Sequence, residues 1–159
     1  MKEDTKLESF NLERRGFKKV SNANVNTKLP TRSDKYSAGY DFYLNKDVII
    51  KPKEQIVIST GIKAFMMPDE VLILQVRSSI GIKKNLMLSN SLGIIDSSFY
   101  NNPANEGNIQ CVLYNYGDKT QELKAGDRIV QGIFMKYLIA DNDIFANTER
   151  IGGIGSSGN

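Results

Sequence analysis

The chain has 159 residues, of which 40% are hydrophobic and 25% charged, which is typical of one globular domain with its own core. Its 21 Lys and Arg against 18 Asp and Glu give a formal charge of +3, too small to indicate a nucleic-acid or membrane partner. The chain has no His, no Trp and a single cysteine, Cys111, which excludes Ser-His-Asp and Cys-His catalysis, an internal disulfide and the usual zinc sites.

The two ends of the chain differ in composition from its middle. Residues 1–16 are dense in charge, and we expect a tail or a short frayed helix without the apolar stretch of a signal peptide. No apolar run approaches the ~20 residues of a membrane span, so a cytoplasmic protein is expected. Residues 146–159 are rich in Gly and Ser and are expected to form a mobile C-terminal arm. One domain is therefore predicted over residues 17–145.

Between these ends the chain consists of short apolar runs separated by Gly, Pro, Asn, Asp and Lys. No run sustains the i, i+3, i+4, i+7 spacing of an amphipathic helix over three turns. Many short strands at regular spacing favour an all-β sandwich or barrel. In chain order, strands are expected at 40–44, 48–50, 55–62, 71–76, 109–114 and 128–137.

Three of the six arginines adjoin small or Gly-rich segments. Arg77 precedes two serines, Arg128 follows Gly-Asp, and Arg150 precedes a Gly- and Ser-rich stretch. The planar guanidinium binds phosphate at two points, which Lys does not do. The stretch after Arg150 also offers backbone N–H groups and hydroxyls to an anion, although it is not a Walker A motif. Three independent surface or ion-paired arginines are the alternative.

Asp96 closes an apolar run and precedes two aromatic residues and the turn-forming stretch 101–107. This order predicts a β-hairpin with a long loop. An Asp at the base of a hairpin can orient a water molecule as a general base. A turn or capping role is the alternative.

Asp41 lies within an otherwise apolar strand, directly after Gly39-Tyr40. A carboxylate in such a place needs an Arg, a backbone turn or a hydrated cation as its partner. A buried structural ion pair is therefore the alternative to a functional role.

Taken together and in order, these segments resemble the five motifs of the trimeric dUTPase family. The matching segments are 38–41, 77–79, 90–96, 126–131 and 150–158. The resemblance implies a β-rich distorted jelly roll that forms a homotrimer, with active sites shared between subunits and the C-terminal arm reaching over a neighbour's site. It also implies hydrolysis of dUTP to dUMP and pyrophosphate with Mg²⁺, by attack of water on the α-phosphorus. Such a reaction limits uracil in DNA and supplies dUMP for dTMP synthesis.

The resemblance assigns roles to single residues. Asp96 matches the general base, and Asp41 matches the acid that touches Mg²⁺ through its waters, the metal being held mainly by the triphosphate. Phe99 matches the aromatic residue, usually Tyr, that packs on the deoxyribose and leaves no room for a 2′-hydroxyl, with Tyr100 as the alternative. Positions matched around uracil are Asn90, Gly93, Ile94 and Ile95, with Gln110 opposite on the returning strand. Positions matched to the phosphates are Arg77, Ser78, Ser79, Arg128, Gln131 and Arg150, the last at the γ-phosphate.

The arm departs from the family pattern at one position. Ile154 stands where the family carries a Phe that caps uracil. Because an aliphatic side chain cannot stack on the base, binding of uracil weaker by about 1 kcal/mol is expected. Gly155 and Ser156 are expected to contact the substrate beside it. The loop over 101–106 is also longer than the minimal hairpin of the family.

Two other classes of protein with this fold are the alternatives to a dUTPase. A dCTP deaminase shares the fold but needs a Glu-centred site and Ala-Arg after Arg-Ser-Ser, where this chain has Ile80-Gly81. A nucleotide-binding regulator would keep the fold with little turnover, and some phage-borne relatives bind repressor proteins, so a partner of that kind is an added possibility. Asp96 and Arg150 favour the enzyme.

Overall fold

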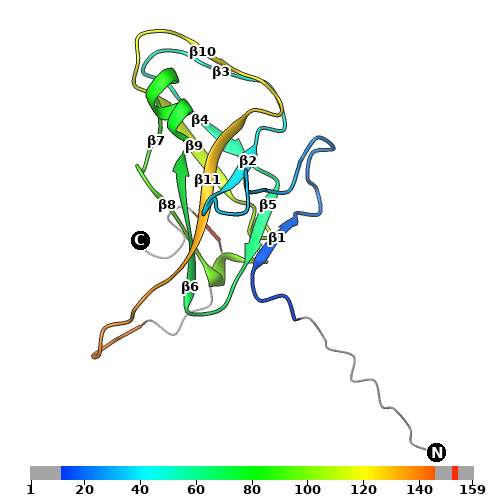
Figure 1. Ribbon diagram of the computed structural model, residues 1–159, viewed down its shortest axis with the longest axis vertical. Helices are drawn as coiled ribbons and strands as arrows, with labels where there is room; N and C mark the ends of the chain where they lie inside the picture. The colour runs from blue at the N-terminus through cyan, green and yellow to red at the C-terminus, as the bar shows by residue number, and fades with distance from the viewer. Residues whose placement is uncertain (1–11, 146–151, 154–159) are drawn as a thin grey trace, which may run out of the picture.

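The computed structural model describes residues 12–145 and 152–153, and nearly all regular structure in them is β (Figure 1). The strands are β1 Gly16–Lys19, β2 Tyr40–Tyr43, β3 Val48–Ile50, β4 Gln55–Ser59, β5 Ile62–Phe65, β6 Glu70–Val76, β7 Leu86–Leu88, β8 Gly93–Asp96, β9 Gln110–Asn115, β10 Gln121–Leu123 and β11 Arg128–Lys136. Two short helices, η1 Ser79–Lys83 and η2 Ser97–Phe99, interrupt them. In these residues no helix has the length and apolar character needed to cross a membrane.

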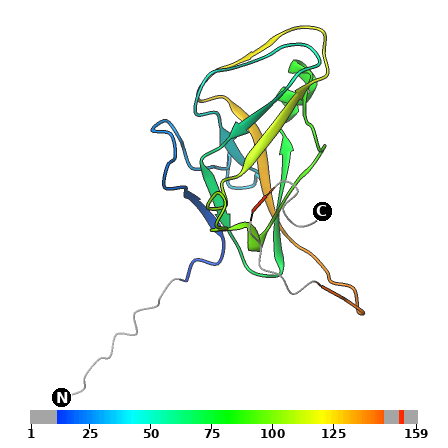
Figure 2. The same ribbon diagram turned by 180° about the vertical axis from the view of Figure 1, so that it is seen from behind.

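Two antiparallel sheets form the body of the fold. One has the strand order β2-β11-β6-β8 and the other the order β4-β9-β7, while β1-β5 and β3-β10 form two-stranded pairs. Figures 1 and 2 show the molecule from opposite sides, with the β3-β10 ribbon at one end. The inward side chains of both larger sheets meet in one apolar cluster. The fold is thus two layers of sheet around one core.

The local cause of each strand is the alternation of apolar and polar residues. In β6 the side chains of Leu72 and Leu74 are buried, while Val71 and Ile73, which alternate with them, are partly exposed. In β9 the same alternation buries Cys111 and Leu113. Successive residues of a strand point to opposite faces, and burial of each such side chain contributes about 1.5–3 kcal/mol.

Two expectations about strands are corrected. The strand expected at 55–62 is two strands, because Gly61 turns the chain with φ +71° between β4 and β5. The expected hairpin after Asp96 does not form, since β8 pairs with β6 whereas β9 pairs with β4 and β7. The connection over 97–109 is long enough to cross from one sheet to the other, whereas a tight turn would force its two strands to pair.

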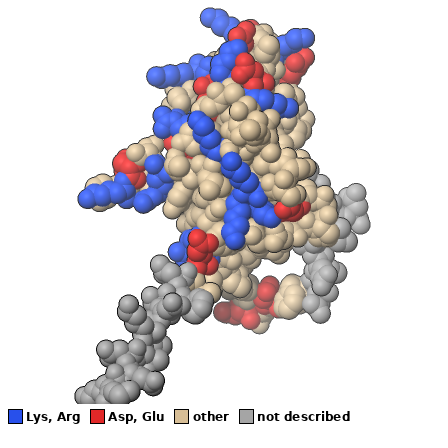
Figure 3. Space-filling view, turned by 90° about the vertical axis from the view of Figure 1, so that its right-hand side faces the viewer, with Lys and Arg blue, Asp and Glu red and all other residues tan. Residues whose placement is uncertain are grey.

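The N-terminal segment enters the fold earlier than expected. Gly16 opens β1, which pairs with β5, and Arg15 Nε donates to the buried Glu70 carboxylate at 2.9 Å. Residues 1–11 of the expected tail lie outside the described residues. Figure 3 shows Lys and Arg gathered in a band along one face.

Candidate active site

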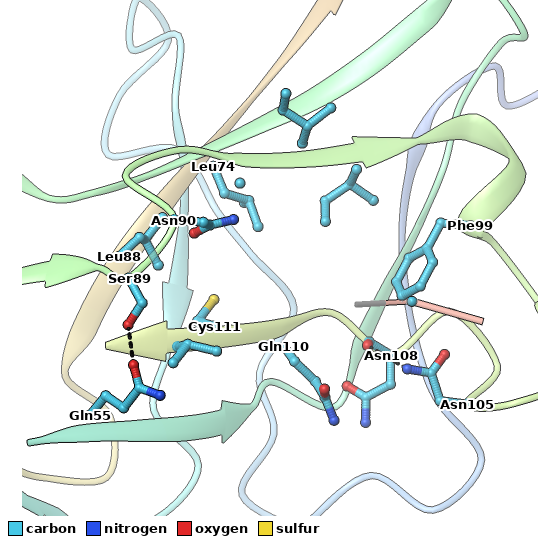
Figure 4. Close-up of a pocket in the computed structure, with 15 residues that line it drawn as sticks. Gln55, Leu74, Leu88, Ser89, Asn90, Phe99, Asn105, Asn108, Gln110 and Cys111 are labelled. Carbon is cyan, nitrogen blue, oxygen red and sulfur yellow. Dashed lines mark hydrogen bonds between the residues drawn. The ribbon is translucent and has the colours of Figure 1, made fainter. Parts of the chain in front are cut away.

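A cavity of about 730 Å³ opens between the two sheets, where the edge strands β7 and β8 face each other (Figure 4). Its lining includes all six residues that the sequence placed around the base and sugar: Asn90, Gly93, Ile94, Ile95, Phe99 and Gln110. The structure therefore brings these positions together from β8, β9 and the segments before and after β8. A cavity of this size suits a small organic ligand.

Sequence reasoning missed several residues of this cavity. Ser89 donates to Gln55 Oε1 at 3.0 Å across the wall formed by β7 and β4 (Figure 4). Asn105 and Asn108 line the wall near Phe99, and apolar Leu74 and Leu88 close the floor from the core. No local pattern marks Gln55 or Ser89, because only the pairing of β4 and β7 with β9 brings them together.

The Phe99 ring forms part of the cavity wall and is 7% exposed. Gly153 lies against it so closely that a Cβ on Gly153 would be 2.8 Å from the ring. Tyr100, the alternative at this place, instead packs edge-on against Phe65 at 5.9 Å between ring centroids. Of the two aromatic residues, Phe99 is the one that faces the cavity.

Asp96 is the last residue of β8, three positions before Phe99, and its side chain is exposed. It pairs in register with Val71 of β6, and Ile94 pairs with Ile73, so Asp96 and Ile94 share one sheet face. This face points away from the core. A carboxylate there is accessible to water beside the cavity.

The phosphate-side arginines meet at a different place. Arg77 Nε lies 2.9 Å from Asp41 Oδ1, and Arg128 donates to Asp41 Oδ2 at 3.1 Å. Ser33 also donates to Asp41 Oδ2 at 3.1 Å. The Asp41 side chain is 5% exposed, and a buried carboxylate of this kind is stable only when paired. The ion pair that was the alternative for Asp41 is thus present.

Three further residues expected at the phosphates surround this ion pair. Ser78 and Ser79 are exposed where η1 begins, directly after Arg77. Gln131 of β11 lies beside Asp41 in register and is partly buried. None of these residues, nor Asp41 and its arginines, lines the cavity among the residues that the structure describes.

The two groups lie at opposite ends of the outer face of one sheet. Three cross-strand rows of this face are Asp41–Gln131–Gln75, Ile133–Ile73–Ile94 and Met135–Val71–Asp96. The first row therefore lies about 13 Å along the strands from the last. An apolar centre that includes Ile94, 60% exposed, separates them. On one chain the Asp96 carboxylate and the arginines do not converge.

The described residues offer no ready-made metal cage. Within 12–145 and 152–153 no three Cys, Asp or Glu side chains come close enough to share a metal ion. Both oxygens of Asp41 are already engaged by Arg77, Arg128 and Ser33. These residues do not fit direct binding of Mg²⁺ by the protein alone. Burial raises the pKa of the Cys111 thiol to about 12, so this cavity residue is neither a ligand nor a nucleophile at neutral pH.

The loop that follows Phe99 is anchored by Glu106. Hydrogen bonds from Lys63 Nζ and from Ser21 lower the pKa of Glu106 from its ordinary 4.5 to about 2. Since the folded-state pKa lies below the unfolded value, the stabilisation is complete above about pH 4.5 and is lost as the pH falls towards 2. We expect the difference in unfolding free energy between the wild type and Glu106→Gln to shrink over this range. Urea unfolding at several pH values checks this, and a difference independent of pH would contradict it.

The remaining expected substrate contacts are in the arm. Arg150, Ile154, Gly155 and Ser156 lie outside the described residues. Gly153, which is described, contacts Phe99 of its own chain. That the arm closes over a neighbour's site stays a prediction.

Known proteins resemble this chain over most of its length. A family model for dUTPase matches residues 25–158. The deoxyuridine 5′-triphosphate nucleotidohydrolase of Lactococcus lactis subsp. lactis is 45% identical over 148 residues, which cover 91% of this chain and 97% of that protein.

Solved structures agree with these sequence matches. The crystal structure of dUTPase from Streptococcus mutans is 42% identical with a TM-score of 0.75, covering 80% of this chain and 99% of that one. A dUTPase variant from phage phi11 of S. aureus, described with a structural Mg(II) ion, is 20% identical with a TM-score of 0.68 and covers 86% and 99%. The predicted all-β jelly roll is confirmed. The chain belongs to the dUTPase family.

Proposed function

We propose that this chain hydrolyses dUTP to dUMP and pyrophosphate, with a water activated by Asp96 attacking the α-phosphorus. The observation that carries the proposal is the cavity between β7 and β8, with an exposed carboxylate at the end of β8 beside it. Membership of the dUTPase family supports the substrate and reaction. Hydrolysis of a phosphoanhydride needs positioning and charge neutralisation more than covalent chemistry, so a site without His suffices.

The base is proposed to bind along the edge of β8 that does not pair with β6. In the described residues β8 pairs only with β6, so its other edge presents backbone N–H and C=O groups beside the cavity. The side-chain amides of Asn90 and Gln110 also line the cavity. Buried polar groups of fixed position reject a base that leaves them unpaired. The Phe99 ring is proposed to pack on the deoxyribose and exclude a 2′-hydroxyl.

The triphosphate is proposed to bind at the other end of the sheet, at Arg77 and Arg128. The contacts given for Asp41 are to Arg77 Nε and Arg128 Nη1, and a guanidinium has five N–H donors, so donors are proposed to remain for phosphate oxygens. The exposed Ser78 and Ser79 add hydroxyl donors beside Arg77. Gln131 and the arm residues Arg150, Ile154, Gly155 and Ser156 complete the proposed contacts.

A homotrimer with shared sites is proposed because the two halves of the site do not meet on one chain. The outer face of the β2-β11-β6-β8 sheet has an apolar centre with Asp96 at one end and Asp41 at the other. A second copy covering this centre buries exposed apolar area. It also brings the arginines of one chain to the cavity of its neighbour.

Mg²⁺ is proposed to bind mainly through the oxygens of the triphosphate. Mg²⁺ is commonly held by substrate phosphates and water with few protein ligands, which agrees with the donor set of the described residues. The phi11 relative described with a structural Mg(II) ion supports a metal in this fold. When bound, the metal neutralises part of the phosphate charge.

Substitution of Gly93 tests the cavity as the base site. A Cβ at Gly93 would lie 2.9 Å from Leu74 Cβ, so Ala must displace β8 at the cavity wall. We expect Gly93→Ala to raise the KM for dUTP by about 10-fold or more, the scale of overpacking penalties of 1–3 kcal/mol. Gly81→Ala is the matched control, because its Cβ meets nothing closer than 3.5 Å. Folded Gly93→Ala protein with an unchanged KM would contradict the assignment.

A further inference from the structure

A nearly buried lysine lies behind the cavity, outside its lining. The Lys63 side chain of β5 is 11% exposed. Its ammonium donates to Asn101 Oδ1 at 2.7 Å and to Glu106 Oε1 at 2.8 Å, and lies 5.3 Å from the centroid of the Tyr100 ring. The other Glu106 oxygen accepts from the backbone N–H and the hydroxyl of Ser21, at 2.9 and 2.6 Å. The Lys63–Glu106 ion pair thus ties β5, the N-terminal segment and the loop together.

The loop over 100–108 is built directly onto Phe99. The buried Asn102 donates to the Phe99 carbonyl from both its side chain, at 2.9 Å, and its backbone, at 3.3 Å. The loop closes where the Asn101 N–H donates to the Glu106 carbonyl at 3.1 Å. The Glu106 N–H also donates to the Asn102 carbonyl at 2.9 Å, so Asn102 links the closed loop to the backbone of Phe99.

The conformation of this loop is strained and depends on its contacts with Lys63. Asn101 and Glu106 both have positive φ values, +56° and +63°, which are unfavourable for residues other than glycine. These are the two residues that Lys63 binds. Because a buried charge left without its partner is strongly destabilising, the loop and Lys63 hold each other in place.

We propose that Lys63 and Glu106 are positioning residues that fix the Phe99 ring and thereby set how strongly the cavity rejects a nucleotide with a 2′-hydroxyl. The inference rests on the proposed function. A ribonucleotide has one more oxygen than a deoxyribonucleotide. Steric exclusion of so small a group requires that the side chains of the cavity wall are held rigidly in place. Phe99 forms part of that wall, and the ion pair anchors the loop whose Asn102 bonds to the Phe99 carbonyl.

The test compares dUTP and UTP in the full-length protein. Lys63→Met removes the charge and keeps most of the volume, and Glu106→Gln removes the opposite charge. We expect either variant to lower the ratio of kcat/KM for dUTP to that for UTP by about 10-fold. The change should arise from faster UTP turnover, with kcat for dUTP within about 2-fold of wild type. Lys63→Arg should restore part of the ratio.

Lys124→Met is the matched control, because it breaks the exposed ion pair with Asp47 far from the loop in sequence. Its ratio should equal that of the wild type. If Lys63→Met does not fold, the Glu106→Gln variant tests the inference. The Glu106 side chain is 37% exposed, so the fold should tolerate this change better. A folded variant with an unchanged ratio, or with dUTP and UTP affected equally, would overturn the inference. A wild type that does not hydrolyse dUTP would instead overturn the proposed function.

Discussion

Replacement of Asp96 by Asn is expected to lower kcat for dUTP by about 10²- to 10⁴-fold, the range that general base catalysis supplies. Asn keeps the shape of the side chain but cannot take a proton from water at neutral pH. Asp96 lies at the end of β8 on the outer sheet face and is not part of the cavity lining. Affinity for dUTP should therefore remain within a few-fold of the wild type.

Single-turnover kinetics and titration with a non-hydrolysable dUTP analogue separate the two effects. Asp118→Asn is the matched control, because that carboxylate is 94% exposed and bonds only to Lys53 among the described residues. It should leave kcat unchanged. Loss of binding together with turnover in Asp96→Asn would show that the carboxylate holds the substrate or the fold and does not activate water.

Co-expression of two variants that are each inactive alone is expected to restore activity. If each site takes Asp96 from one subunit and Arg77 from another, a trimer of Asp96→Asn and Arg77→Gln chains contains sites in which both residues are intact. Random assembly from equal amounts makes this true of about one quarter of the sites. Gln is chosen for Arg77 because its amide can still donate to the buried Asp41. In this variant Asp41 also retains its ion pair with Arg128.

The measurement is dUTP turnover after co-expression of the two variants, compared with each alone. Activity near a quarter of the wild-type value supports shared sites. Mixed trimers as inactive as their parents would show that Asp96 and Arg77 act within one chain. A single chain would then have to use both residues at one site, although the rows at the two ends of the outer sheet face are about 13 Å apart along the strands.

Local pattern predicted several strands, because burial in a sheet alternates residue by residue, but it did not mark the short strands β1, β7 and β10. The runs at 48–50, 71–76 and 109–114 correspond to β3, β6 and β9 within one residue at each end. The order of short motifs predicted the family, and the comparisons confirm it. Both signals are carried by neighbouring residues and need no knowledge of the three-dimensional pairing.

Pairing between distant strands could not be read from the sequence. The hairpin expected after Asp96 is absent because β8 pairs with β6, whose paired residues lie 19 to 25 positions earlier, and β9 joins the other sheet. The contact of Lys63 with Glu106 spans 43 residues and has no local signature. The ion pair at Asp41 was an open alternative, because the sequence shows an acid within an apolar strand and scattered arginines without showing which of them meet.

Other expectations remain predictions. Contacts from Arg150, Ile154, Gly155 and Ser156 fall outside the described residues. A contact of Asp41 with Mg²⁺ through water, the homotrimer and a repressor-type protein partner are likewise predicted from the family resemblance.

The most direct test of the central claim is pyrophosphate release by the wild-type chain from dUTP, with dCTP, UTP and dTTP alongside, each with and without Mg²⁺. We expect rapid release from dUTP with Mg²⁺, at least about 100-fold slower release from the other three, and a marked loss when Mg²⁺ is chelated. Equal release from all four nucleotides, or none from dUTP, would contradict the assignment of the β7–β8 cavity as a site for deoxyuridine.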